Sequence, residues 1–151
     1  MIEFDRSILG KEFVLGTFSV TEDMMRAFAQ AVGETSPQYV DAEAAKKTAY
    51  AGLVAPPIFY DVFRGDQIPD PRVKFGKVGF NAGQRCEFYA PIRPGDTITM
   101  KTRITDVYEK TGRTGKMVFI VRETTYENQQ GEKVAVVEQS QVRRESGEAR
   151  E

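Results

Sequence analysis

A change of hydrophobic period near the middle of the chain is the feature that most limits its possible folds. In the first half apolar residues recur every three or four positions, whereas from Phe80 onward they alternate with polar residues. The first pattern is typical of amphipathic helices and the second of half-buried strands. Turn residues divide the second half into four strand candidates, at residues 84–90, 97–108, 116–127 and 133–142. Helices followed by an antiparallel sheet predict an α+β domain, in which the concave face of the sheet buries one apolar helix.

Helix-start residues mark two helices in the first third of the chain. Thr21 is followed by acidic residues and then by apolar residues at helical spacing, so it is expected to cap a helix that Gly33 ends. Asp41 is expected to cap a shorter, alanine-rich helix over residues 42–47. Residues 35–37, between these two helices, are expected to form a turn.

A third helix is expected after two consecutive prolines, Pro56 and Pro57, which fit the first turn of a helix. Residues 58–63 supply its apolar side chains, and Gly65 ends it. The following residues, 66–76, contain prolines and an aspartate and are expected to form the most mobile loop of the domain.

The composition excludes several classes of site. The 151 residues include no histidine, so proton transfer would have to use carboxylates, tyrosine or backbone groups. The single cysteine, Cys86, excludes an internal disulfide and a cysteine-rich zinc site, and is expected to be a small buried hydrophobe. The net charge of -1 gives no basic surface for nucleic acid or anionic lipid. We therefore expect no metal, no cofactor, no nucleic acid and no membrane partner.

The length of 151 residues fits one domain, and the sequence contains no repeat and no linker. We expect residues 1–143 to form this domain and residues 144–151, which are charged and unpatterned, to be a disordered tail. No apolar run approaches the ~18 residues of a membrane-spanning helix, and the first residues do not resemble a signal peptide. The protein is therefore predicted to be soluble and cytoplasmic.

Three segments together resemble one known family. They are residues 28–41 (FAQAVGETSPQYVD), residues 52–57 (GLVAPP) and residues 90–97 (APIRPGDT). They are similar to the MaoC-like hot-dog proteins, and most closely to their FAS1-like N-terminal dehydratase branch, over about Gly10 to Arg143. The resemblance implies a hot-dog fold, in which an antiparallel sheet wraps around a central helix.

The resemblance also implies where a catalytic site would lie. Catalytic members of the family are (R)-specific enoyl-CoA hydratases or 3-hydroxyacyl dehydratases, which hold water between an aspartate and a histidine five residues apart. In this chain Glu34 falls at the aspartate position and Tyr39 at the histidine position. Tyrosine, with an ordinary pKa of ~10, is a poor base at neutral pH. The backbone N–H that polarises the thioester carbonyl in catalytic relatives falls at Pro56 or Pro57, and proline has no N–H.

Other residues are predicted to bind the substrate. Ala55, Pro56, Pro57 and Tyr60 are expected to border an acyl tunnel, and Arg85 is expected to meet the phosphates of coenzyme A or of a carrier protein. Each candidate also has a purely structural interpretation. Glu34 would bind turn amides at the end of a helix and Tyr39 would be a packing residue. Arg85 would be a solvated strand charge.

Three functions remain open at this point. In the leading hypothesis the chain is a non-catalytic or weakly active hot-dog subunit that binds the acyl chain of an acyl-CoA or acyl-carrier-protein thioester beside a catalytic MaoC-like partner. In the second it is a self-sufficient homodimeric hydratase or dehydratase that uses Glu34. In the third it is an acyl-CoA binding module without turnover.

Overall fold

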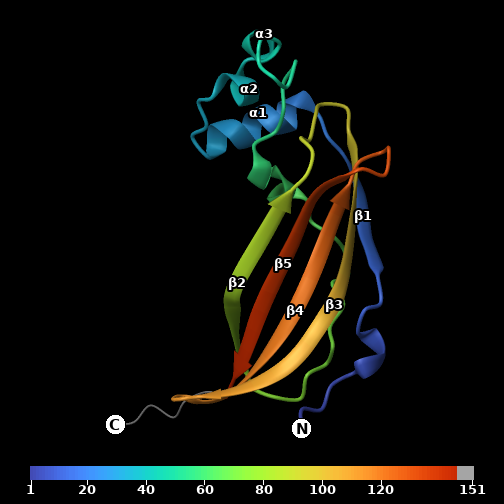
Figure 1. Ribbon diagram of the computed structural model, residues 1–151, viewed down its shortest axis with the longest axis vertical. Helices are drawn as coiled ribbons and strands as arrows, with labels where there is room; N and C mark the ends of the chain where they lie inside the picture. Colours follow the sequence, from blue (N-terminus) through green and yellow to red (C-terminus); the bar gives the residue numbers. More distant parts are fainter. Residues whose placement is uncertain (146–151) are drawn as a thin grey trace.

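A five-stranded antiparallel sheet forms most of the computed structural model, which describes residues 1–145 (Figure 1). Its strands are β1 (Phe13–Ser19), β2 (Val78–Phe88), β3 (Thr97–Gly112), β4 (Gly115–Glu127) and β5 (Lys133–Arg144). They lie in the order β1-β3-β4-β5-β2, so that β1 and β2 are the two edges. The four strands predicted from the alternating half of the sequence are thus confirmed as β2 to β5.

Three short α-helices gather at one end of the sheet, where β2 ends (Figure 1). They are α1 (Glu22–Ala31), α2 (Pro37–Val40) and α3 (Ala42–Ala45). The two predicted caps are confirmed: Thr21 Oγ1 accepts a hydrogen bond from the N–H of Met24 at 3.2 Å, and Asp41 Oδ1 accepts from the N–H groups of Glu43 and Ala44 at 3.0 and 3.1 Å. Where a turn was expected at residues 35–37, Pro37 instead begins the single turn of α2.

The helix in the concave face of the sheet is short. The helix expected over residues 58–63 is a 3₁₀ helix, η2 (Pro57–Val62), which buries Phe59 and Tyr60. A second 3₁₀ helix, η1 (Arg6–Ile8), lies near the N-terminus. The sheet therefore curves around one short apolar helix, as the α+β prediction required.

One strand and several boundaries differ from the predictions, including that of β2, which begins at Val78 and ends at Phe88 where residues 84–90 were expected. β1 was missed, because only Leu15 of its seven residues is buried and Gly16 interrupts it with a bulge. The hairpin between β3 and β4 is tighter than expected, since Gly112 pairs with Gly115. β5 continues through Arg144, the first residue of the predicted tail, because that residue pairs with both Val78 and Met117. The rest of that tail, from residue 146 onward, lies outside the described residues.

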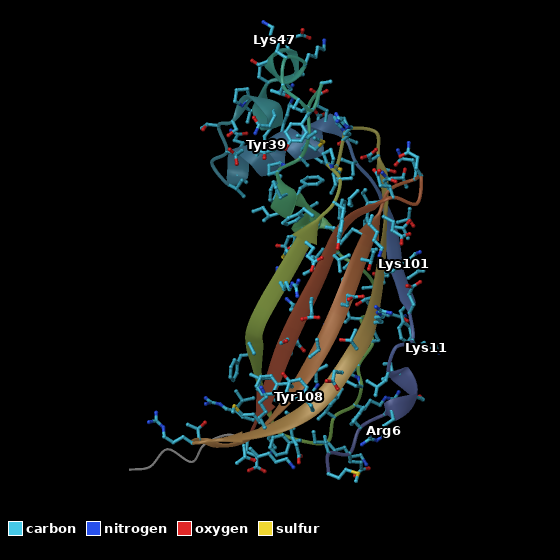
Figure 2. The ribbon with its side chains drawn as sticks, in the orientation of Figure 1. Arg6, Lys11, Tyr39, Lys47, Lys101 and Tyr108 are labelled. Carbon is cyan, nitrogen blue, oxygen red and sulfur yellow. The ribbon has the colours of Figure 1, made fainter. Side chains whose placement is uncertain are left out.

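The core consists of two apolar clusters on the concave face. The first surrounds η2 and includes Phe59, Phe63 and Met25. The second lies toward the other end of the sheet and contains Ile8, Val73, Ile104, Val107, Val118 and Ile120. Figure 2 shows Tyr39 among the helices at the first end and Tyr108 at the second. Within residues 1–145, no helix is long and apolar enough to cross a membrane.

The outer edge of β2 has no partner strand among residues 1–145. Within this range the strand pairs with β5 alone, and almost all of its eleven residues are exposed. The apolar side chains of Phe80, Phe88 and the adjoining Tyr89 are 46%, 47% and 58% exposed. A long free edge with exposed aromatic residues is typical of a surface that pairs with another chain.

Candidate functional site

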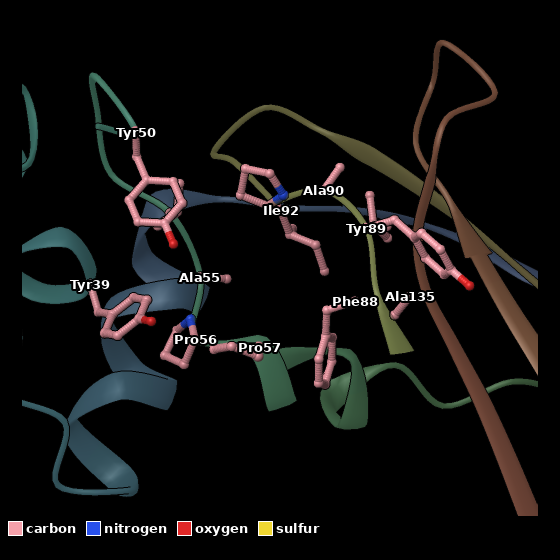
Figure 3. Close-up of a pocket in the computed structure, with 13 residues that line it drawn as sticks. Tyr39, Tyr50, Ala55, Pro56, Pro57, Phe88, Tyr89, Ala90, Ile92 and Ala135 are labelled. Carbon is pink, nitrogen blue, oxygen red and sulfur yellow. The ribbon is translucent and has the colours of Figure 1, made fainter. Parts of the chain in front are cut away.

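A cavity of about 220 Å³ lies between the helical end of the molecule and the end of β2 (Figure 3). Its walls are formed by Tyr39, Tyr50, residues 54–57, residues 88–92 and residues 134–135. Most of these side chains are apolar or aromatic. The arrangement suits an apolar ligand with few polar groups.

Backbone hydrogen bonds hold these segments together. The N–H of Ala55 donates to Ile92 O at 2.8 Å, which joins the segment before η2 to the turn after β2. The N–H of Val54 donates to Gln38 O at 3.0 Å, which ties the same segment to α2. All three segments that carry the family resemblance, residues 28–41, 52–57 and 90–97, therefore meet at the cavity, the first of them through Tyr39.

Tyr39 and Tyr50 stand on one wall of the cavity, and their hydroxyl groups point toward its interior (Figure 3). Tyr39 is held there by α2, whose first turn is begun by Pro37. Tyr39, which was predicted to be a site residue, thus lines this cavity. A phenol at this place can donate or accept one hydrogen bond.

Glu34 is not among the residues that line the cavity. Its Oε1 accepts hydrogen bonds from the N–H groups of Thr35 and Ser36 at 3.1 and 3.2 Å. The hydrogen bond from the Ser36 amide is the largest cause of a lowered pKa for this carboxyl group. Glu34 is therefore a carboxylate that stabilises the turn before α2, and the structure does not bring it together with Tyr39 at the cavity.

Pro56 and Pro57 line the cavity at the start of η2. Neither has an N–H, so the first backbone donor of this helix belongs to Ile58. The next, the N–H of Phe59, is already bound to Pro56 O at 2.9 Å. The two prolines therefore supply an apolar wall and no hydrogen bond for a thioester carbonyl. Ala55, also predicted to bind substrate, lies beside them and is 6% exposed.

Tyr60 and Arg85 lie away from this cavity. Tyr60 lines a second cavity of about 180 Å³ on the concave face of the sheet. Its hydroxyl accepts a hydrogen bond from Gln84 Nε2 at 2.7 Å and contacts Cys86 Sγ at 3.2 Å, and burial raises its pKa. Arg85 is on β2, where it pairs with Glu87 at 2.7 Å and is 75% exposed. It lines neither cavity.

Several lining residues were missed by sequence reasoning, above all Tyr50, Phe88, Tyr89 and Ile92. Ile92 lies inside a segment that the family resemblance marked, and the three aromatic residues lie just before such segments. Residue 50 precedes residues 52–57, and residues 88 and 89 precede residues 90–97. The sequence could have indicated Tyr50, Phe88 and Tyr89 as lining residues, because they are aromatic residues at the borders of these segments.

The chemistry available in this site is limited. Within residues 1–145 no group of three or more His, Cys, Asp or Glu side chains is placed to hold a metal ion. The polar atoms that face the cavity come mainly from tyrosine hydroxyls, and no carboxylate is among its lining residues. The site is built to bind an apolar group more than to transfer protons.

Comparison with known proteins gives consistent matches. The family model of the FAS1-like dehydratase domain region matches residues 7–137. A UPF0336 protein of Streptomyces griseus is 33% identical over 115 residues, which are 72% of this chain and 76% of the relative.

Solved structures share the fold. The MaoC-like dehydratase from Rhodospirillum rubrum has a TM-score of 0.71 at 22% identity, covering 93% of this chain and 94% of that one. A chain of the C-terminally truncated HadBC (3R-hydroxyacyl-ACP dehydratase) complex from Mycobacterium tuberculosis has a TM-score of 0.68 at 27% identity, covering 91% and 98%. These likenesses confirm the expected α+β hot-dog fold.

Proposed function

Because the chain belongs to the FAS1-like dehydratase family, we propose that it is the acyl-chain-binding subunit of an enzyme that hydrates enoyl thioesters or dehydrates 3-hydroxyacyl thioesters. In this proposal a MaoC-like partner supplies the acid–base chemistry. The observation that supports it is an apolar cavity lined by Tyr39, Pro56 and Pro57, with no histidine and no carboxylate among its lining residues.

Three features argue against chemistry by this chain alone. The chain has no histidine, Glu34 is bound to turn amides, and two prolines occupy the start of η2. Loss of one oxyanion donor costs ~3 kcal/mol of transition-state stabilisation, which is on the order of a hundredfold in rate. A weakened acid–base pair would reduce the rate further.

The cavity favours an acyl chain as its ligand. Prolines, an alanine, an isoleucine and the rings of Tyr39, Tyr50 and Phe88 form its walls. Burying a methylene group in such a site contributes about 0.8 kcal/mol. The tyrosine hydroxyls provide a polar end for the thioester or for a 3-hydroxyl group.

The free edge of β2 favours a partner beside the cavity. Phe88 and Tyr89 belong both to this edge region and to the cavity wall. A second hot-dog sheet that paired with β2 would satisfy its unpaired backbone groups and would lie next to the acyl chain. The relative from Mycobacterium tuberculosis comes from a complex, which supports an assembly of this kind.

The proposal can be tested by reconstitution. The chain would be purified alone and together with a MaoC-like protein of the same organism that has the intact aspartate and histidine, and hydration of crotonyl-CoA and longer 2-enoyl-CoA substrates would be measured. The pair should be active, the chain alone at least ~100-fold slower, and the partner's His→Ala variant inactive.

A contrary result would favour the self-sufficient hydratase. Robust turnover by the chain alone, abolished by Glu34→Gln and retained by the matched control Glu43→Gln, would assign the acid–base role to Glu34. Glu43 is a suitable control because it is exposed and pairs only with Lys46, one turn further along the chain.

A further inference from the structure

A charged residue interrupts the inward-facing row of β4. Val118, Ile120, Thr124 and Tyr126 of this row are all buried. Arg122 lies in the middle of the row and faces the same side, because side chains two residues apart in a strand share a face. A guanidinium group therefore occupies the concave face between the two apolar clusters.

Arg122 and polar residues at paired positions on the neighbouring strands form a polar band across the sheet. Arg122 pairs with Gln139 on β5, and Gln139 pairs with Gln84 on β2. Gln139 Nε2 donates to Gln84 Oε1 at 3.3 Å, and Gln84 Nε2 donates to the Tyr60 hydroxyl at 2.7 Å. Thr124, in the next row, is also buried and hydrogen-bonds Thr102 at 3.0 Å.

Arg122 is half-buried and has few hydrogen-bond partners among the described residues. Its Nε is shielded from solvent and has no hydrogen-bond partner, and its only hydrogen bond to the described residues is a 3.3 Å contact from Nη2 to Pro69 O. Within residues 1–145 no carboxylate lies within 4 Å of its guanidinium nitrogens. A charge that is partly withdrawn from water and has no ion-pair partner is costly, and this desolvation lowers the pKa of Arg122.

Asp70 is the acid whose charge acts on Arg122, but its carboxylate interacts with other residues. Asp70 lies on the loop that covers Arg122, and its charge acts on that residue. Its Oδ1 accepts a hydrogen bond from the Arg72 N–H at 2.9 Å and lies 3.7 Å from Arg143 Nη2. Asp70 therefore does not supply the missing counter-ion of Arg122.

Arg122 borders the second cavity, with Gln84, Gln139, Thr124 and Tyr60. The other charges on this cavity are Asp61 and Arg64, which are 3.8 Å apart and offset one another. The cavity thus has one uncompensated positive charge, at its inner wall, and amide and hydroxyl groups around it.

We propose that this second cavity binds the distal carboxylate of an acyl chain, with Arg122 as its counter-ion. Guanidinium matches carboxylate in charge and in its forked geometry, and the second N–H of Gln139 Nε2, whose first N–H is bound to Gln84, can donate to a remaining lone pair. The Tyr60 and Phe88 rings, 6.2 Å apart, separate this cavity from the first one. The proposal requires an acyl chain held in the first cavity to pass between these two rings on its way to Arg122. The inference rests on the proposed function, since it assigns the substrate class of the same protein as ω-carboxyacyl thioesters.

The test compares matched ligands by isothermal titration calorimetry on the full chain. Adipoyl-, suberoyl- and sebacoyl-CoA are each set against the unsubstituted acyl-CoA of the same length. At the optimal length the carboxylated ligand should bind at least about tenfold tighter, as expected for a charge-assisted pair in a shielded site. Equal or weaker binding at every length overturns the inference.

Two variants assign the effect to Arg122. Arg122→Met should abolish the preference, and it should fold because it replaces a half-buried charge that has no ion-pair partner by an apolar chain of similar length. Arg122→Lys, which keeps the charge but loses the fork, should retain only part of the preference and serves if the methionine variant fails to fold. Arg103→Met is the control, since Arg103 pairs with Glu123 and lines neither cavity. A preference that survives Arg122→Met in a folded protein overturns the assignment.

Free suberate and its uncharged dimethyl ester separate this inference from the proposed function. If no acyl-CoA binds but suberate binds more tightly than dimethyl suberate in an Arg122-dependent way, the carboxylate site stands and the proposed function fails. If the carboxylated and unsubstituted acyl-CoA ligands bind equally, the proposed function stands and the carboxylate site fails. Inorganic phosphate that binds as tightly as suberate would overturn the carboxylate assignment.

Discussion

Tyr60 and Phe88 approach one another across the end of the sheet, with ring centroids 6.2 Å apart. Phe88 faces the first cavity and Tyr60 the second, so this one contact divides the concave face into two compartments. Tyr60 comes from η2 and Phe88 from the last position of the free edge strand β2. A partner that binds to β2 would therefore contact Phe88, one of the two rings that lie between the cavities.

The first prediction concerns the size of the first cavity. Ala55→Trp should fill it and should weaken binding of a long-chain acyl-CoA much more than binding of a four-carbon analogue, because each buried methylene contributes ~0.8 kcal/mol. Calorimetry with the partner present would measure both. Ala27→Trp, on the exposed face of α1, is the control. Equal weakening of both ligands would place residue 55 at the mouth of the cavity, and no effect would remove it from the site.

The second prediction concerns association through β2. Native mass spectrometry of the purified chain should show a homodimer, or a heteromer when the partner is present. Phe80→Asp should shift this assembly to monomers, since it places a charge on the exposed edge region. Val14→Asp is the matched control, because Val14 is 64% exposed on the opposite edge strand, β1. A wild-type chain that is monomeric at micromolar concentration would contradict the prediction.

The third prediction concerns Glu34 and acid. Because turn amides lower the pKa of Glu34 in the folded protein, its contribution to stability is present above the ordinary value of 4.5 and is lost as the pH falls through the lowered pKa. Glu34→Gln should therefore reduce the melting temperature at neutral pH and should converge with the wild type in acid. Glu43→Gln, whose carboxylate makes no hydrogen bond to turn amides, should show a smaller difference. A constant difference across this pH range would exclude the carboxylate as the cause.

The fourth prediction concerns alkaline pH. Burial raises the pKa of both Tyr60 and Tyr126 above the ordinary tyrosine value of 10.0. Such groups contribute stability below that value, and the contribution is lost as the pH rises toward their folded pKa. Unfolding free energies should therefore decrease above pH 10.0. The double variant Tyr60→Phe with Tyr126→Phe should flatten this decrease, whereas Tyr108→Phe should not.

Much of the fold was predictable because its signals are local. The caps at Thr21 and Asp41 and the strands after Phe80 follow from neighbouring residues, and each is confirmed. β1 escaped prediction because Gly16 and a bulge break its alternation. The short η2 follows two prolines, which fixed its start but did not determine that it would be 3₁₀ rather than α-helical.

The site was predicted less completely because it depends on contacts between distant residues. The family resemblance located Tyr39 and residues 55–57, and all of them line the first cavity. Phe88 reaches the same cavity only through the pairing of β2 with β5. The isolation of Arg122 likewise depends on the register of β4 and β5 and on where the loop before β2 lies, and none of this can be read from the residues around it.

The polar band between the two apolar clusters has a consequence for folding cooperativity. Side-chain packing is interrupted at Arg122 and Gln139, so the two ends of the molecule are coupled mainly through the backbone ladder of β3 and β4, the two strands that contribute residues to both clusters, and through the pairing of β5 with β4. Amide hydrogens in the middle of these ladders should exchange only on global unfolding, while those of α1, α2 and α3 open in a smaller local unit. The sheet backbone, more than a continuous core, makes this chain a single cooperative body.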